Sequence, residues 1–320
     1  MRIKNKILLA GLLAVAMAAS ALSGCGRNEK DAVINTENNN INDNDIKNNN
    51  SNNEISASEE MNNVTKAASQ KKTDTLNPDE VTTGNAEYRG FTLDNVLHSK
   101  SEGDIHYNVY IPDSYDGTKE YALYITLPGY QGLYFQGVGE NIKTEDFGFE
   151  AQKYNPDMII VAPQLNDWGQ TSADQAIELT KYFIKNYKID SSKVYINGYS
   201  GGGETLSLIL GKEPELFTAA LMCSSQWDGS YEPVVASRTP VYFVIGESDE
   251  YYGSAPFKKA YQTLYNLYKK QGLSDSEIDR LLVLDVKGKD YFEGTQITYQ
   301  HGGGYLFCRD ERIMGWLFNH

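Results

Sequence analysis

The stretch that most constrains the fold is the sequence GYSGG at residues 198–202. It follows β-branched and aromatic residues at 194–196 and precedes an apolar stretch at 205–210 with helical character. This order predicts a strand, a tight turn and a helix, with Ser200 at the corner. A G-x-S-x-G turn holds a serine where a base can reach its hydroxyl, so Ser200 is the candidate nucleophile. The pattern is short, so the elements around it must carry the fold assignment.

Short apolar runs alternate with helical patterns on both sides of this turn. The runs cover residues 121–127, 158–162, 194–197, 219–223, 241–245 and 281–286, and the clearest helical patterns cover 173–187 and 255–270. Strands that are apolar throughout are typical of a parallel sheet covered by helices on both faces. Alternating patterns at 88–97 and 105–111 predict antiparallel strands at the N-terminal edge. No long insertion interrupts the alternation, so we expect an α/β fold with no large lid.

Polar residues follow the later strands, at the edge where a parallel sheet places its sites. Asp249 comes after the run at 241–245, and His301 comes after the run at 281–286. The chain order of nucleophile, acid and base is then Ser200, Asp249, His301. The spacing after the strand favours Asp249 as the acid over its neighbours Glu247 and Glu250.

The scarcity of histidine supports the choice of base. The chain has four histidines. His98 and His106 fall in the predicted antiparallel strands, and His320 is the last residue of the sequence. Only His301 follows a strand of the parallel part, so we expect it to be the catalytic base.

A serine hydrolase also needs hydrogen-bond donors for the oxyanion of its tetrahedral intermediate. The sequence LPGYQG at 127–132 leaves the strand beside the predicted turn. The amide of Tyr130 is one candidate donor, since Pro128 has none. The amide of Gly201, at the start of the predicted helix, is the other. The alternative for residues 127–132 is an ordinary turn at the end of a strand.

Aromatic side chains on the predicted loops are candidates for substrate contact. Trp168, Trp227 and Tyr252 are the residues chosen here, from a larger set that includes Tyr130, Tyr134, Phe135, Tyr251 and Tyr305. An aromatic wall suits a sugar or a phenolic acyl group. The alternative is that a chain with 23 tyrosines places them in every environment.

The first residues have the pattern of an export signal. Arg2, Lys4 and Lys6 precede an apolar run at 7–22, and the sequence LSGC follows at 22–25. This ending resembles a bacterial lipobox, in which the cysteine is lipidated after cleavage. We therefore expect a lipoprotein signal peptide at 1–24 and lipidation of Cys25, which would attach the protein to the outer face of the bacterial cytoplasmic membrane. The alternative is an uncleaved membrane anchor.

Composition divides the rest of the chain in two. Residues 25–85 are rich in Asn, Asp, Glu, Ser and Lys and predict a disordered tether, whereas residues 86–320 suit one catalytic domain.

The net charge of −14 argues against a nucleic-acid partner. We expect a monomer in which Cys223 and Cys308 are buried thiols, although a disulfide between them stays open. Dispersed histidines and the absence of a phosphate-binding glycine loop predict neither a metal nor a cofactor.

From residue 107 to the C-terminus the sequence resembles the α/β-hydrolase superfamily. Within it, the chain is similar to the secreted polyhydroxybutyrate-depolymerase-like and the feruloyl or acetyl-xylan esterases. The similarity rests on YIPDSY at 110–115, LPG at 127–129, APQ at 162–164, IDSSKVY at 189–195, the turn at 198–202, GESD at 246–249 and HGG at 301–303. Pro128 stands where many relatives have a histidine, and Gly202-Gly203 stands where many have a larger residue.

This resemblance implies an acyl-transfer hydrolase with Ser200, Asp249 and His301 as its triad and Tyr130 and Gly201 at the oxyanion hole. We expect a serine esterase for short or aromatic acyl groups, with a small-molecule or polymeric ester as substrate. One alternative is a serine peptidase resembling the prolyl oligopeptidase family, which shares the catalytic order. Another is a non-catalytic binding lipoprotein on a hydrolase scaffold.

Overall fold

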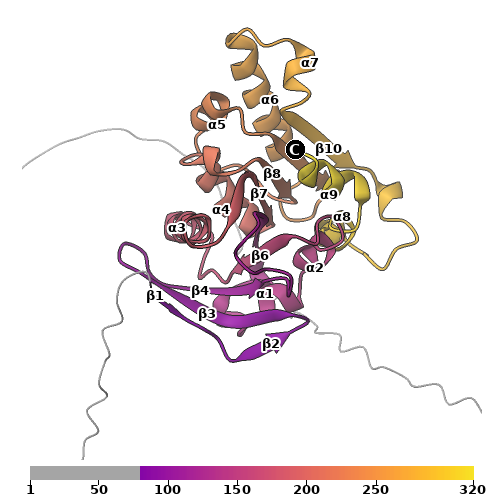
Figure 1. The fold of residues 1–320 in the computed structure, drawn as a ribbon. Coiled ribbons are helices and arrows are strands. Elements are labelled where there is room, and N and C mark those ends of the chain that lie inside the picture. Colours follow the sequence, from indigo (N-terminus) through magenta and orange to yellow (C-terminus); the bar gives the residue numbers. More distant parts are fainter. Residues whose placement is uncertain (1–79) are drawn as a thin grey trace, which may run out of the picture. The chain divides into compact units, whose positions relative to one another are not determined.

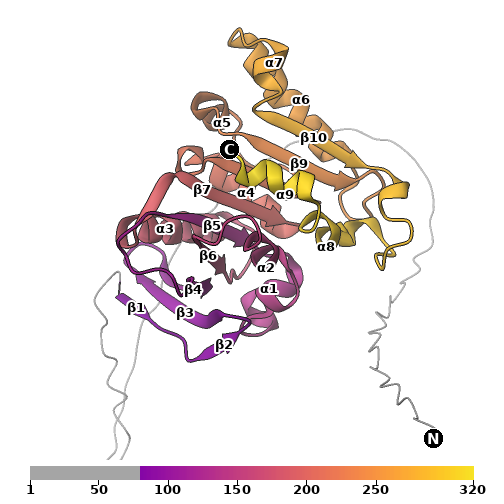
Figure 2. The same ribbon diagram turned by 45° about the vertical axis from the view of Figure 1, so that its right-hand side comes forward.

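Ten strands form one mixed sheet in the computed structural model, which describes residues 80–320. The strands are β1 (Glu80–Thr82), β2 (Ala86–Tyr88), β3 (Phe91–Ser99), β4 (Gly103–Tyr110), β5 (Tyr121–Leu127), β6 (Met158–Pro163), β7 (Ile189–Tyr199), β8 (Ala219–Cys223), β9 (Val241–Gly246) and β10 (Leu282–Lys287). They lie in the order β1-β3-β4-β6-β5-β7-β8-β9-β10, and β2 pairs with β3. The N-terminal strands therefore form one end of the sheet and β10 the other (Figures 1 and 2).

The predicted division into antiparallel and parallel strands is confirmed. β3 pairs antiparallel with β1, β2 and β4, and β4 pairs antiparallel with β6. Strands β5 to β10 pair parallel with one another. β5, β6 and β8 are buried along their whole length, as their uninterrupted apolar sequences predict. A strand buried on both faces needs a layer of helices on each side.

Helices cover both faces of the sheet, as expected. One face packs against α3 (Gln170–Asn186), α4 (Gly201–Leu210), α5 (Glu232–Ser237) and α6 (Ala255–Lys270), with α7 (Asp275–Ile278) beyond (Figure 1). The other face packs against α1 (Glu140–Lys143), α2 (Phe147–Ala151), α8 (Gly304–Phe307) and α9 (Glu311–Phe318). Side chains alternate between the two cores: Leu123 and Ile125 of β5 join the first, and Ala122 and Tyr124 join the second. This alternation follows from the two-residue period of a strand.

The connections at the C-terminal edge of the sheet are irregular. Within residues 80–320 there are five 3₁₀ helices, of which all but η3 follow the C-terminal end of a strand: η1 (Tyr130–Gly132), η2 (Tyr134–Gln136), η3 (Pro214–Leu216), η4 (Lys289–Tyr291) and η5 (Gln300–Gly303). Between β5 and β6, residues 128–157 carry only η1, η2, α1 and α2. Within residues 80–320, no insertion of domain size covers that edge.

One predicted strand is wrong at its start. Residues 88–97 were expected to form a single strand, but the chain reverses at Arg89 and Gly90, whose φ angles are 49° and 88°. Two successive positive φ values make a tight hairpin turn whose twist matches that of the flanking strands. Ala86–Tyr88 therefore runs back along Phe91–Leu93 as β2.

The sheet begins before the boundary predicted at residue 86. β1 pairs with β3 through Glu80 and His98, so residues 80–82 belong to the sheet. The signal peptide at 1–24, Cys25 and the remainder of the tether lie outside the described residues. Within residues 80–320, none of the helices has the length and apolar character needed to span a bilayer.

Candidate active site

The predicted strand, turn and helix around Ser200 are present as β7, a one-residue turn and α4. Ser200 has φ 54° and ψ −126°, a backbone conformation that residues with a side chain rarely adopt. The turn is tight because its glycines touch backbone. A Cβ at Gly198 would lie 2.3 Å from the carbonyl oxygen of Gly202, and one at Gly202 would lie 2.5 Å from that of Leu127. Glycine at these two positions therefore allows the tight turn that holds Ser200 in a strained backbone conformation.

Ser200, His301 and Asp249 form a continuous chain of hydrogen bonds. The Ser200 Oγ lies 2.9 Å from Nε2 of His301, and Nδ1 of His301 lies 2.9 Å from Oδ2 of Asp249. Three separate elements supply these side chains, because His301 lies on η5 and Asp249 follows β9. Both His301 and Asp249 are buried, which shields the pair from competing water. The arrangement can take the hydroxyl proton of Ser200 onto His301 and stabilise the resulting imidazolium.

The surroundings of Asp249 keep it ionised. Burial raises the pKa of this carboxyl, but the hydrogen bond from His301 and those from the amides of Tyr252 and Tyr251 outweigh it, so the pKa is lowered overall. The two amides lie 2.9 Å and 3.0 Å from Oδ1. A carboxylate held in this way orients the imidazole and balances its charge.

Glu250, which competed with Asp249 as the acid, contacts the backbone instead. Its carboxylate accepts hydrogen bonds from the amide of Gln300 at 3.0 Å and from the amide of His301 at 2.9 Å. The side chain of Gln300 in turn accepts from the amide of Ser248 at 2.6 Å. The loop after β9 and the loop that carries the base are therefore tied together through Glu250.

Tyr199 is a contact of the base that sequence reasoning missed. Its hydroxyl donates to the carbonyl oxygen of His301 at 2.5 Å, and its ring stacks on the imidazole with centroids 5.8 Å apart. Burial raises the pKa of Tyr199, so the hydroxyl stays a donor. The variable second position of the G-x-S-x-G motif gave no signal for this role.

The two candidate oxyanion donors lie in segments that pack on each other. A Cβ at Gly129, the residue before Tyr130, would lie 3.4 Å from Cβ of Ser200. Gly201 and Tyr130 are the first residues of α4 and η1, respectively. The amides of a first helical turn have no carbonyl partner within their helix, so they are free to bind an anion.

Comparison with known proteins finds one sequence family and several solved structures similar to this chain. Residues 164–271, which include Ser200 and Asp249, match the prolyl oligopeptidase family. The structure of a thermostable esterase superposes with a TM-score of 0.56 at 18% identity, covering 72% of this chain and 62% of the esterase chain. Structures of oligopeptidase B from Leishmania major and from Trypanosoma brucei each give a TM-score of 0.47 at 12% identity, over 72% of this chain and 36% and 38% of theirs. No curated protein sequence matches the chain.

The chain has the α/β-hydrolase fold. The α/β-hydrolase fold predicted from the motifs is confirmed, and residues 164–271 are similar in sequence to the prolyl oligopeptidase family. The narrower resemblance to secreted esterases stays a prediction. The chain spans 62% of the length of the esterase structure, so the activity of that whole protein is not transferred.

Two of the three aromatic residues chosen for substrate contact lie beside Gly201 and His301. The indole of Trp168 covers the turn, since a Cβ at Gly201 would lie 2.2 Å from its ring. The ring of Tyr252 lies 5.7 Å from the imidazole of His301, and its hydroxyl donates to Glu204 at 2.7 Å. Tyr130 packs edge-on against Trp168 with centroids 6.4 Å apart.

Trp227, the third, is placed elsewhere. Its ring stacks on Tyr231 with centroids 5.2 Å apart, and its Nε1 donates to the carbonyl of Gly229 at 2.8 Å. It lines a depression of about 370 Å³ beside α5 and α6, and no triad residue contributes to that lining. In the structure Trp227 therefore packs beside α5 and α6, and its contact with a substrate stays a prediction.

A cavity of about 310 Å³ lies beside Tyr199, the residue before Ser200. Three tyrosines, a phenylalanine and several polar residues line it: Gln131, Thr144, Glu145, Asp146, Phe147, Tyr199, Ile297, Tyr299, Gly302, Gly304 and Tyr305. Gly302 is next to His301 in sequence. Glu145 accepts a hydrogen bond at 2.6 Å from the amide of Gly129, which lies in residues 128–132, called the oxyanion turn after the candidate donor Tyr130. No triad residue lines this cavity, but Tyr199 and Gly302, the sequence neighbours of Ser200 and His301, do.

The side chains of His98, His106, Cys223 and Cys308 are not part of the hydrogen-bond chain at Ser200. His98 pairs with Asp104 and His106 with Asp94 on the antiparallel strands, each at 2.7 Å. Cys223 and Cys308 are both free and buried. Among residues 80–320, no group of three or more His, Cys, Asp or Glu side chains is arranged to hold a metal ion.

Proposed function

We propose that this α/β-hydrolase is a serine esterase that cleaves carboxylic esters through an acyl-enzyme. The observation that carries the proposal is the chain of hydrogen bonds from Ser200 through His301 to Asp249, on a strained turn between a strand and a helix. A side-chain hydroxyl becomes a useful nucleophile when a positioned base removes its proton in the transition state. The match of residues 164–271 to a family of serine hydrolases supports the same chemistry.

The reaction begins with attack of the Ser200 oxygen on the ester carbonyl carbon. His301 takes the hydroxyl proton on Nε2, and the amides of Tyr130 and Gly201 bind the oxyanion that forms. Collapse of this intermediate breaks the bond to the alcohol, which leaves with the proton from His301. Water then attacks the acyl-enzyme by the same route, releasing the acid and regenerating Ser200.

We assign the substrate group to the cavity beside Tyr199. Its volume of about 310 Å³ and its mixture of rings and polar side chains suit a sugar or a phenolic acyl group better than a long alkyl chain. Trp168 and Tyr252 add aromatic surface beside Gly201 and His301. The fold shared with a thermostable esterase is consistent with ester hydrolysis.

A serine peptidase is the second candidate, and the match to the prolyl oligopeptidase family favours it. The triad serves either reaction, because both pass through an acyl-enzyme. The ratio of kcat/KM for p-nitrophenyl butyrate to that for prolyl and arginyl p-nitroanilides separates them. A higher value for either anilide would replace the esterase with the peptidase.

A non-catalytic binding lipoprotein is the third candidate. A fluorophosphonate probe tests it directly, since the probe forms a covalent bond only with an activated serine. Labelling of the wild-type protein that is lost in Ser200→Ala would establish a serine hydrolase. An unlabelled wild-type protein would overturn the proposed function.

We also propose that the enzyme is tethered to the outer face of the bacterial cytoplasmic membrane through lipidated Cys25. The proposal is carried by the sequence LSGC that follows the apolar run at 7–22. A polymeric ester outside the cell would then be hydrolysed at the cell surface.

A further inference from the structure

Glu145 contacts the turn that carries one of the two oxyanion donors. Its Oε1 accepts a hydrogen bond from the amide of Gly129 at 2.6 Å. Gly129 precedes Tyr130, whose amide is the expected donor, so fixing the Gly129 amide restrains the orientation of the next peptide. An oxyanion hole is effective because its donors are already aimed before the reaction begins.

The same contact lies against the nucleophile. A Cβ at Gly129 would lie 3.2 Å from Oε1 of Glu145 and 3.4 Å from Cβ of Ser200. The Glu145 carboxyl and the Ser200 side chain therefore both lie next to the Cα of Gly129. Glycine at position 129 permits this approach, which a larger residue would obstruct.

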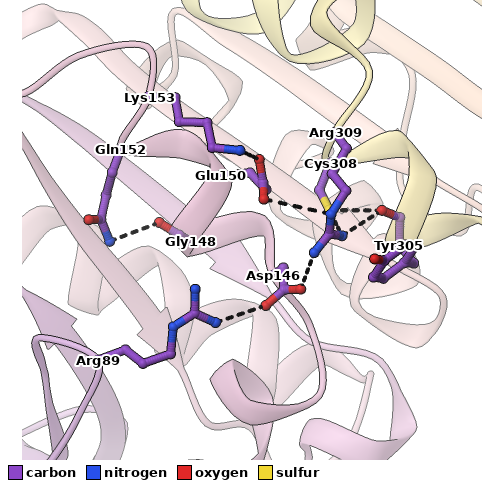
Figure 3. Close-up of polar contacts among 9 residues, drawn as sticks. All are labelled: Arg89, Asp146, Gly148, Glu150, Gln152, Lys153, Tyr305, Cys308 and Arg309. Atoms are coloured by element: carbon purple, nitrogen blue, oxygen red, sulfur yellow. Dashed lines mark hydrogen bonds and ion pairs between the residues drawn. The ribbon is translucent and has the colours of Figure 1, made fainter. Parts of the chain in front are cut away.

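An ion-pair network fixes the segment that holds Glu145 (Figure 3). The next residue, Asp146, pairs with Arg89 of the N-terminal hairpin at 3.3 Å and with Arg309 near the C-terminus. Arg309 also donates to the carbonyl of Tyr305 at 2.7 Å and lies over its ring. Both ends of the described domain thus hold the loop between α1 and α2, which keeps the Glu145 carboxyl at the oxyanion turn.

No cation balances a charge on Glu145. Within residues 80–320, no Lys, Arg or His forms an ion pair with it, and the amide of Gly129 is its hydrogen-bond partner. Burial raises the pKa of Glu145 to about 8. At pH 7 most of this carboxyl is therefore uncharged.

The groups that face Glu145 from the sheet and from the C-terminal helices do not titrate near pH 8. They are Tyr124 on β5, Tyr199 on β7, Cys223 on β8 and Cys308 after α8. Burial raises the pKa of each, to about 12 for Cys308. Asp146, on the same loop, is paired with two arginines.

We propose that Glu145 is a positioning residue that holds the oxyanion turn through the amide of Gly129. The proposal rests on Ser200 being the nucleophile of the proposed function. It has a consequence for pH, because ionisation of Glu145 above pH 8 would place a negative charge beside the developing oxyanion. The stronger hydrogen bond to Gly129 is then present in the ground state and the transition state alike, whereas the repulsion acts only in the transition state. We expect a roughly tenfold fall in rate from pH 7 to pH 10.

The test is the rate of inactivation by a fluorophosphonate probe between pH 6 and pH 10, measured on the full chain. The probe places its phosphoryl oxygen in the oxyanion hole whatever the natural substrate is. Glu145→Ala removes the hydrogen bond and should lower the maximal rate of inactivation tenfold or more, with little change in probe affinity. Glu145→Gln keeps an acceptor for Gly129, so it should restore most of that rate and remove the fall above pH 8. Glu247→Gln removes an exposed carboxyl after β9 and serves as the control.

The outcomes separate this proposal from the proposed function. A wild-type rate in Glu145→Ala, or a fall above pH 8 that persists in Glu145→Gln, would overturn the positioning role while leaving Ser200 as the nucleophile. If Glu145→Ala does not fold, the pH profile of Glu145→Gln decides alone. An unlabelled wild-type protein overturns the serine hydrolase, and the role of Glu145 falls with it.

Discussion

Glu250 accepts a hydrogen bond from the backbone amide of His301 at 2.9 Å, although the imidazole of the same residue binds Asp249. Asp249 and Glu250, which are adjacent on one loop, thus bind different parts of His301: its imidazole and its backbone amide. Asp249 orients the ring, and Glu250 fixes the loop that carries it. Their substitutions should therefore have effects of different size.

Asp249→Asn should lower the activity far more than Glu250→Gln does. Asp249→Asn removes the charge that stabilises the imidazolium and favours the wrong tautomer, so we expect kcat to fall about 10³- to 10⁴-fold. Glu250→Gln still offers one acceptor to the His301 amide, and we expect a loss of about tenfold. Hydrolysis of p-nitrophenyl acetate measures both, and a larger loss in Glu250→Gln would make Glu250 the essential acid.

Ser200→Ala should abolish esterase turnover and leave the fold intact. Removal of the nucleophile leaves only binding and oxyanion contributions, so we expect kcat to fall at least about 10³-fold. Ser230→Ala, at an exposed serine, is the matched control and should keep wild-type activity. Circular dichroism checks the fold, and unchanged hydrolysis of p-nitrophenyl acetate by Ser200→Ala would refute the nucleophile.

Asp310→Ala should destabilise the domain. Asp310 caps α9 through the amide of Arg312 at 2.9 Å and pairs at 3.2 Å with Lys287, whose side chain is only 4% exposed. Its loss weakens the helix cap and removes one of the partners of a buried ammonium group, so we expect the free energy of unfolding to fall by about 3 kcal/mol. Glu293→Ala breaks the exposed pair with Lys289 and should change it by less than about 0.5 kcal/mol. Urea unfolding measures both.

The contribution of Asp310 should also depend on pH. Burial raises the pKa of this carboxyl, but the charge and hydrogen bond of Lys287 more than offset it, so the folded pKa is lowered. A lowered pKa stabilises the fold fully above the unfolded value of about 3.9, and the contribution disappears as the pH falls through the folded value. The difference in urea midpoint between wild type and Asp310→Ala should therefore shrink from pH 7 to pH 2. An equal difference at both pH values would contradict this.

The enzyme should prefer short or aromatic acyl groups. Each methylene buried in a deep apolar tunnel would add about 0.8 kcal/mol, so a tunnel would make kcat/KM climb with chain length. The cavity of about 310 Å³ is lined by tyrosines and polar side chains, and we expect a plateau or a fall after butyryl. Acetyl, butyryl, octanoyl and palmitoyl esters, with feruloylated and acetylated oligosaccharides, test this. A maximum at octanoyl or palmitoyl would indicate a lipase.

Replacement of Cys25 should release the protein from the membrane. Lipidation needs the thiol, so Cys25→Ala should move the protein from the membrane fraction to a soluble or incorrectly processed form. Mass spectrometry of the wild-type protein gives the direct check. A mature chain without lipid would replace the tethered enzyme with a freely secreted one.

Sequence alone determined the strands of the parallel core and the turn at Ser200, because both depend on local patterns. An apolar run such as residues 219–223 is long enough for a buried strand, and GYSGG fits a close-packed turn whatever lies elsewhere. The order Ser200, Asp249, His301 also follows from sequence, since each residue comes at or after the end of a strand. The reversal at Arg89 and Gly90 was missed because alternation continues across so short a turn.

Tertiary structure alone decided which side chains meet the triad. Tyr199 and His301 are separated by 102 positions, and Glu145 reaches Gly129 from a different loop. Trp227 was expected near Ser200, yet its loop packs toward α5 and α6. Periodicity reports which face of an element is buried, whereas these contacts depend on how separate loops pack at the edge of the sheet. Loop packing is set by side chains distant in sequence, so no local pattern could place Tyr199, Glu145 or Trp227.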